Sequence, residues 1–192
     1  METEELIARQ KQECIFCHIV AGKVGSRKIY EDERLIVILD INPANPGHML
    51  VMPKEHYSVL PQLPEDDVAR IGFVVKALSQ ACLKALGARG TTIFAANGIA
   101  AGQRASHFMI HIIPRHPNDN VKIMLPEEEL AKEELENCTQ KLKAIFSQIS
   151  GMPTLQQETN SSNNPKGETK NTAVLNEVTK FLLKKGNKNG SM

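Results

Sequence analysis

The chain has 192 residues, a formal net charge of +1 at neutral pH, no tryptophan and only 4% aromatic residues. This length predicts one domain with appendages, because compact domains cluster near about 100–150 residues. The near-neutral charge gives no global field that would attract nucleic acid or a membrane surface. The scarcity of aromatic side chains also argues against stacking of single-stranded bases, so we expect neither a nucleic-acid nor a membrane partner.

The first residues indicate a cytoplasmic protein. The segment Met1-Glu2-Thr3-Glu4-Glu5 is acidic, whereas a signal peptide opens with basic residues and continues with an apolar run. No apolar run approaches the roughly 20 residues that a membrane span needs. In the cytoplasm the four cysteines are expected to be thiols or metal ligands rather than disulfides.

Three helices and five short strands are expected in the first 150 residues. A polar segment over residues 4–12 has a helix-forming composition. Longer helices are expected over 64–85, where Pro64 and three acidic residues suit the first turn and Gly87 suits the C-cap, and over 126–149. Alternating or β-branched apolar residues predict five strands, the first two joined as a hairpin: 28–31, 34–40, 48–52, 91–96 and 107–113.

Beyond these elements the composition changes. Residues 151–171 are rich in Asn, Gln, Ser, Thr, Lys and Glu, so they lack the apolar area needed to offset the entropy of ordering, and we expect a flexible linker. A short apolar stripe from Val174 to Leu182 then predicts an amphipathic tail helix. The expected organisation is an N-terminal helix at 1–13, a main domain at 14–118, a helical extension at 119–150, the linker at 151–171, and the tail helix with a frayed end at 172–192.

The last expected strand carries a distinctive pattern. Side chains alternate along a strand, so one face holds His107, Met109 and His111, and the other holds Phe108, Ile110 and Ile112. The two histidines lie about 6.6 Å apart on one face, and each buried ring nitrogen needs a partner. We therefore favour a functional role for this pair, whereas simple gap filling would suffice to explain Met109.

Cys14 and Cys17 form a Cys-x-x-Cys pair for which several roles are open. With His18 it matches a haem-attachment pattern, but that requires export, which nothing in the sequence indicates. A thioredoxin-like redox pair would open a helix in a βαβ context, which this N-terminus lacks. Half of a tetrahedral zinc site fits better, and two packed reduced thiols are the simplest structural alternative.

The strand from His107 resembles the signature of the histidine-triad (HIT) family of nucleotide hydrolases and transferases, in which His-x-His-x-His precedes two apolar residues. His107 and His111 match the first and third histidines, and Met109 stands at the middle position, where the family's nucleophile attacks the α-phosphate. The run from Leu39 to His56, with Asp40-Ile41-Asn42-Pro43, Pro46-Gly47-His48 and Pro53-Lys54-x-His56, is also specific to this family.

The resemblance implies an α+β fold with a five-stranded antiparallel sheet and helices over residues 14–118, a homodimer, and a set of site residues. It implies a structural zinc held by Cys14, Cys17, His56 and His107. Asp40 would accept the ribose hydroxyls, Ile41 would lie against the base, and His48 would sit near the nucleophile position with His111. A loop with Asn97, Gly102 and Gln103 would line the phosphates.

Three functions are then open. The favoured one is purine-nucleotide binding with reduced or altered nucleotidyl hydrolase or transferase activity, because the thioether of Met109 is neither a nucleophile of the required kind nor a proton carrier. The second is an active hydrolase of nucleoside phosphoramidates or dinucleoside polyphosphates that uses a rearranged histidine. The third is an interaction scaffold in which the C-terminal helix binds a protein partner.

Overall fold

The computed structural model describes residues 2–151, which fall into two compact units, the first ending at Leu125 and the second beginning at Pro126. The expected tail helix and all of the expected linker except Gly151 lie outside the described residues. The strands are β1 (Lys28–Glu31), β2 (Leu35–Leu39), β3 (Met49–Pro53), β4 (Gly90–Phe94) and β5 (Ile110–Arg115). The helices are α1 (Glu2–Glu13), α2 (Ile15–Val20), α3 (Glu65–Ala85) and α4 (Lys132–Ser150).

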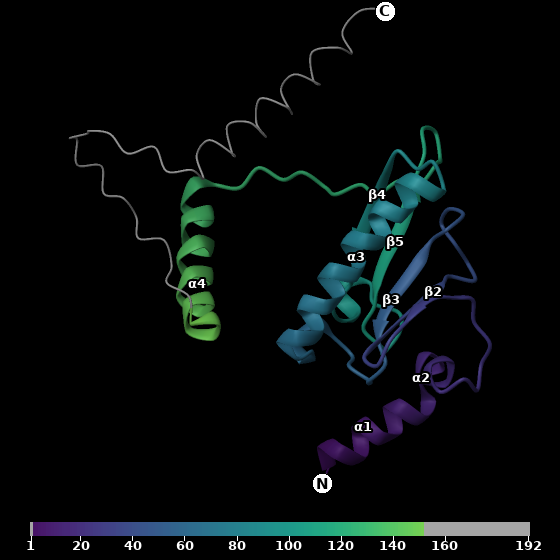
Figure 1. The fold of residues 1–192 in the computed structure, drawn as a ribbon. Helices are drawn as coiled ribbons and strands as arrows, with labels where there is room; N and C mark the ends of the chain where they lie inside the picture. Colours follow the sequence, from purple (N-terminus) through teal and green to yellow (C-terminus); the bar gives the residue numbers. More distant parts are fainter. Residues whose placement is uncertain (1, 152–192) are drawn as a thin grey trace, which may run out of the picture. The chain divides into compact units, whose positions relative to one another are not determined.

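The first unit is built on one antiparallel sheet with the strand order β1-β2-β3-β5-β4 (Figure 1). The expected α+β fold with a five-stranded antiparallel sheet is confirmed. Leu39 pairs with Met49, which in turn pairs with Ile112, so the end of β2 lies level with the middle of β5 across β3. β1 and β4 form the two edges of the sheet.

Apolar side chains cover both faces of this sheet. Leu35, Val37, Phe108 and Ile112 pack with the inner side of α3, which buries Ile71, Val75, Leu78 and Cys82. The alternate residues Ile36, Ile38, Leu50 and Met52 pack with Ile19 of α2 on the other face. Val68 is 40% exposed, although it repeats at helical spacing with the buried Ile71 and Val75.

The fifth strand begins at Ile110, three residues later than expected. Its neighbour β3 ends at Pro53, which has no N–H to continue the ladder. The N–H of Phe108 instead donates to the carbonyl of Tyr57, at 2.6 Å. The side chains still alternate, because Phe108 packs against the α3 side and Met109 against the α2 side.

The second unit contains α4, which begins at Lys132 rather than at Pro126 as expected. The intervening residues include three successive glutamates and offer no apolar stripe, so they would gain little from forming a helix. The spacing predicts an apolar face of Leu135, Cys138, Leu142, Ile145 and Ile149, and all five of these residues are exposed on α4. Neither α4 nor any other helix within residues 2–151 combines the length and apolar character that a membrane crossing requires.

Candidate functional site

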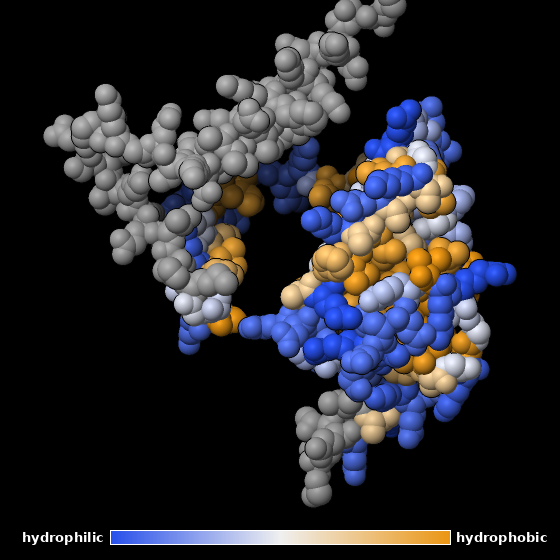
Figure 2. Space-filling model, viewed as in Figure 1, coloured by the Kyte–Doolittle hydropathy of each residue, from blue (hydrophilic) through white to orange (hydrophobic). Residues whose placement is uncertain are grey.

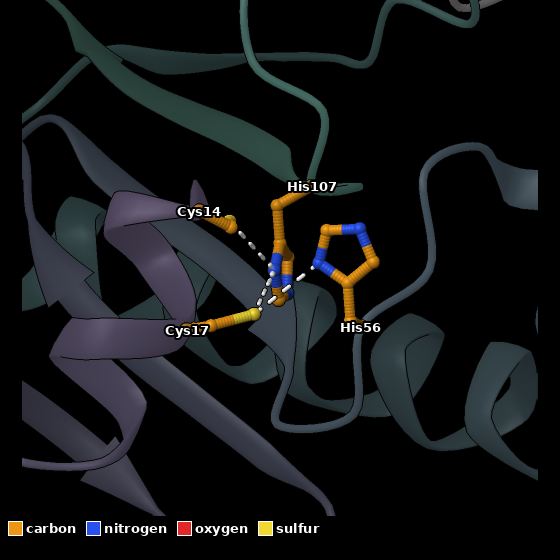
Figure 3. Close-up of side chains that lie close together, drawn as sticks. All are labelled: Cys14, Cys17, His56 and His107. Carbon is orange, nitrogen blue, oxygen red and sulfur yellow. Dashed lines mark hydrogen bonds between the residues drawn. The ribbon is translucent and has the colours of Figure 1, made fainter. Parts of the chain in front are cut away.

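Four buried side chains converge beside the sheet. Cys14 and Cys17 come from the start of α2, His56 from the segment after β3, and His107 from the segment before β5 (Figure 3). The Sγ atom of Cys17 lies 3.2 Å from Nδ1 of His56 and 3.6 Å from Nδ1 of His107, and Cys14 Sγ also lies 3.6 Å from His107 Nδ1. One ligand atom from each of the four lies within 4.8 Å of every other.

These separations fit a metal ion with tetrahedral coordination. Zinc bound at about 2.0–2.1 Å to nitrogen and about 2.3 Å to sulfur would hold its N and S ligands roughly 3.5 Å apart. The remaining ring nitrogen of His107, Nε2, contacts the carbonyl oxygen of Pro53 at 2.9 Å. This contact assigns the proton to Nε2 and leaves the Nδ1 lone pair facing the thiols, as in metal-binding histidines. The four residues could therefore hold a metal ion.

The same geometry separates the roles considered for Cys14 and Cys17. His18 does not join the cluster, because its Nε2 contacts the carbonyl oxygen of Gln12 at 2.9 Å. The pair does open a helix, α2, but α1 precedes it and there is no strand before it as in a βαβ unit. Burial and the neighbouring Cys14 raise the pKa of the Cys17 thiol to about 12, so a metal ion would have to displace its proton.

A cavity of about 650 Å³ opens on the same face of the sheet. Its walls come from α2, the end of β2, the loop before β3, and the segment that leads into β5. Most of the lining is apolar. Met109 forms part of the lining and also packs against the core cluster that contains Ile36 and Leu50. Met109 therefore fills space under the cavity, as the gap-filling explanation expects, and it also faces the cavity interior, as its place in the triad pattern expects.

Three polar residues form a chain along the cavity. Nδ1 of His48 lies 3.5 Å from Oδ2 of Asp40 and accepts the backbone N–H of Ala44 at 3.2 Å, and its Nε2 lies 3.0 Å from Nδ1 of His111. Because a backbone N–H can only donate, His48 carries its proton on Nε2 and donates it to His111. His111 must then carry its own proton on Nε2.

The environment of both imidazoles favours their neutral forms. Burial lowers the pKa of His48 although Asp40 opposes the shift, and burial together with the adjacent His48 lowers the pKa of His111. One ligand atom from each of Asp40, His48 and His111 also lies within 4.8 Å of every other. Asp40 and His111 contact opposite nitrogens of the His48 ring, so in this arrangement the three residues form a directed hydrogen-bond chain.

Comparison with known proteins identifies this combination of sheet, cavity and histidines. A family model described as the HIT domain matches residues 21–118, more than half of the chain. The chain belongs to the HIT family.

Characterised and solved relatives resemble the same part of the chain. The adenylylsulfatase HINT3 of Arabidopsis thaliana is 41% identical over 109 residues, 57% of this chain and 55% of that protein. The histidine triad nucleotide-binding protein of Candida albicans is 30% identical with a TM-score of 0.64, over 71% of this chain and 99% of that one. A zinc-bound histidine triad family protein of Mycobacterium smegmatis is 33% identical with a TM-score of 0.56, over 73% and 98%.

Most of the nucleotide-site residues expected of a HIT protein line the cavity: Asp40, Ile41, His48, Gly102, Gln103, Met109 and His111. Asn97 does not line it, because its side-chain oxygen accepts the backbone N–H of Leu60 at 2.8 Å, and Ala96 lines the cavity in its place. Gln103 holds the loop in shape through its side-chain amide, which bonds Gly98 N–H, Ser58 O and Ala105 O.

Some cavity residues were not predicted from the sequence. The ring of Phe94 stacks on His111 with centroids 4.5 Å apart and planes 4° from parallel, and Phe16 of α2 forms part of the opposite lining. Arg104 lines the cavity next to Gln103. The triad pattern names alternate residues on one strand, so it carries no information about a neighbouring strand or about a loop side chain.

The loop before His48 requires a glycine at position 47. Gly47 has φ of +86°, and a Cβ there would lie 2.5 Å from Cδ1 of Leu86. Asn45 in the same loop donates to the carbonyl of Pro114 and to the carboxylate of Asp119, both at 2.9 Å. These contacts fix the loop that carries Ala44 and His48 against the end of β5.

Proposed function

We propose that the cavity binds a purine nucleotide and that the nucleotidyl hydrolase or transferase activity of this HIT protein is reduced. The observation that carries the proposal is Met109, which lines the cavity between His107 and His111 at the position of the family's nucleophile. The nucleotide-binding title of the Candida relative and the adenylylsulfatase activity named for the Arabidopsis relative support a nucleotide as ligand.

The shape and polarity of the cavity suit a nucleoside. A volume of about 650 Å³ lies within the range of about 300–1,000 Å³ typical of small-molecule sites. Asp40 uses one oxygen to accept the N–H of Asn42, at 2.9 Å, and keeps lone pairs for two ribose hydroxyl donors. Ile41 is 87% exposed at the cavity and offers an apolar surface on which a base can rest.

Met109 removes the covalent route. Imidazole attacks phosphorus because its neutral nitrogen is basic near pH 7, and it can also leave again. A thioether is uncharged, only weakly accepting and unable to carry a proton. The residue therefore leaves a binding site without the nucleophile that would form a nucleotidyl intermediate.

His111 is not a ready replacement. Its Nδ1 is occupied by the proton of His48, and its Nε2 carries a proton, so neither nitrogen presents a free lone pair. In this state His111 can donate a hydrogen bond to a phosphate oxygen. The same chain of bonds that would assist a nucleophile thus disfavours His111 as the nucleophile itself.

Binding and turnover measured on the same preparations test this proposal. The wild-type protein should bind AMP or GMP in calorimetric titrations, yet hydrolyse adenosine 5′-phosphoramidate slowly. Met109→His should raise kcat at least about tenfold, with partial rescue expected because a misplacement of about 1 Å can cost about a hundredfold. Met124→His is the matched control, since Met124 is 82% exposed and does not line the cavity.

The contrary result is equally specific. Substantial wild-type turnover that is abolished by His111→Ala or His48→Ala would mean that another imidazole acts as nucleophile. The protein would then be an active HIT hydrolase, the second function expected from the sequence.

We also propose that the metal held by Cys14, Cys17, His56 and His107 is zinc. Two thiolates and two imidazoles form a four-coordinate set that leaves no open position, as in structural zinc sites. When bound, the ion would supply cross-linking rather than chemistry, because it would tie α2 to the segments that follow β3 and precede β5. The zinc-bound Mycobacterium relative supports this assignment.

A further inference from the structure

Few charged groups surround the cavity. Among the described lysines, arginines, aspartates and glutamates, only Asp40 and Arg104 line it. His48 and His111 also line the cavity, but burial favours their neutral forms. Asp40 and Arg104 therefore set the charge of the cavity, one as a site for hydroxyl donors and the other as a site for an anion.

The two charges come from different segments of the chain. Asp40 directly follows β2, whereas Arg104 lies in the segment that leads into β5. Both line the cavity together with His111 and Met109. A ligand with its ribose at Asp40 and its α-phosphate beside His111 thus leaves Arg104 as the charged side chain available to a further group.

Arg104 has no partner within residues 2–151. Arg34, Arg70 and Arg115 each pair with an aspartate, but the Arg104 guanidinium makes neither a hydrogen bond nor an ion pair in this part of the chain. The backbone N–H groups of Arg104 and Ala105 also donate to no described acceptor. Gln103 fixes this loop at both ends, so a set of unused donors stands at one wall of the cavity.

The Arg104 guanidinium and the free backbone N–H groups are suited to bind a chain of phosphate groups. A guanidinium presents a planar fork that binds two phosphate oxygens at once, and unpaired backbone N–H groups add further donors. A single α-phosphate beside His111 would leave much of this capacity unused. A second anionic group farther along the cavity would engage it.

We infer that Arg104 is a specificity-determining residue that binds the group beyond the α-phosphate. The preferred ligand is then a nucleotide with a second anionic group, such as a nucleoside 5′-diphosphate, rather than a monophosphate. A phosphoramidate places an amine at this position, which offers the guanidinium no negative charge. The inference rests on the proposed nucleotide function and adds the ligand class.

Titration of the full-length protein with adenosine, AMP and ADP tests it. The wild type should bind ADP more tightly than AMP. Arg104→Gln should weaken ADP binding about tenfold, as expected for loss of a charge-assisted contact, and should leave adenosine binding unchanged. Arg104→Lys should retain part of the preference, because it keeps the charge and loses the fork. Arg89→Gln is the control, since Arg89 is exposed and lies outside the cavity.

The outcomes separate the two claims. Equal wild-type affinities for AMP and ADP, or equal losses of ADP binding in Arg104→Gln and Arg89→Gln, would overturn the role of Arg104 and leave nucleotide binding standing. A drop in adenosine affinity as large as the drop for ADP would also overturn it. Absence of binding by all three ligands would overturn the proposed function itself.

Discussion

Asp119 is a single carboxylate that joins the loop before β3 to the end of β5. It accepts hydrogen bonds from Nε and Nη2 of Arg115 at 2.7 and 2.9 Å, from the side chain of Asn45 at 2.9 Å, and from the backbone N–H groups of His116 and Val121. The guanidinium of Arg115, aided by these other donors, holds the pKa of Asp119 well below its ordinary value. The ionised form is therefore the one that the folded state stabilises.

This depressed pKa predicts a loss of stability in acid. Above about pH 4, the ordinary pKa of an unfolded aspartate, Asp119 is ionised in both states and its full contribution is present. As the pH falls from there toward the lower folded pKa, the unfolded state takes up a proton first and the contribution is lost. Urea unfolding should show Asp119→Asn to be less stable than wild type at pH 7, with the gap narrowing at pH 3.

A gap that stays constant from pH 7 to pH 3 would contradict this reading of Asp119. Asp66→Asn is a suitable control, because Asp66 is exposed and its only described partner, Arg34, is 3.8 Å away. That variant should change the acid limb of the stability curve little.

Some residues of the cavity could be predicted from the sequence and others could not. Alternation places Met109 beside two histidines, and the structure retains this although the strand begins only at Ile110. The alternation pattern does not predict that Arg104 and Phe94 line the cavity. Arg104 is a single basic residue in a loop, and Phe94 lies on a different strand, so neither belongs to the repeating pattern of the triad strand. Asn97 does not line the cavity because its side-chain oxygen accepts the backbone N–H of Leu60, which is distant in the sequence.

At the scale of elements, α2 matters more than its six residues suggest. A helix this short has little stability alone. It is held by Ile19 in the core, its Cys14 and Cys17 belong to the cluster that could hold a metal ion, and its Ile15 and Phe16 line the cavity. One short helix therefore links the candidate metal site to the proposed nucleotide site.

Removal of one ligand should test this link. Purified wild-type protein should contain about one zinc per chain, and Cys14→Ser should lose it. A metal present at a hundred times its Kd stabilises by about 2.7 kcal/mol, so the melting temperature should fall by about 5–10 °C. Cys138→Ser should retain both metal and melting temperature, because Cys138 is exposed on α4.

A fully stable, metal-free wild-type preparation would end the zinc proposal. Retention of zinc by Cys14→Ser would instead show that the cluster does not use this thiol.

Element boundaries were the weakest predictions, and two of the misses have a tertiary cause. The start of β5 depends on Pro53 in a neighbouring strand, which residues 107–113 do not reveal by themselves. The helix around Cys17 has few local signals and depends on packing of Ile19. By contrast, α3 and the β1–β2 hairpin carry strong local patterns and lie where expected.

At the scale of the whole molecule, an exposed apolar surface lies on the outer side of α3, where apolar side chains gather in Figure 2. Phe73 is 73% exposed, and Val68, Leu83 and Leu86 are 40–47% exposed. The edge strand β4 also exposes Ile93. Exposed apolar patches and free strand edges favour association, so we propose that the expected homodimer forms on this surface.

A charge at the centre of this surface should separate the subunits. Phe73→Glu should convert a dimer to a monomer in light scattering coupled to size exclusion, because a buried unpaired carboxylate opposes association. Its effect on the isolated fold should be small, since Phe73 is exposed in the monomer. Leu142→Glu on α4 should leave the dimer intact.

The reverse pattern, in which only Leu142→Glu dissociates the dimer, would assign the interface to α4. A monomeric wild-type protein would end the homodimer proposal.

The distribution of thiols has a practical consequence for the exposed apolar stripe of α4. Cys14, Cys17 and Cys82 are buried, and Cys138 alone is exposed, on the same stripe of α4 as Leu135 and Leu142. A maleimide dye should therefore attach at one position without any engineered cysteine. Because that position lies within the apolar stripe, an environment-sensitive dye would change its emission when another molecule covers the stripe. The native chain can thus be labelled at Cys138 to detect a partner that binds α4.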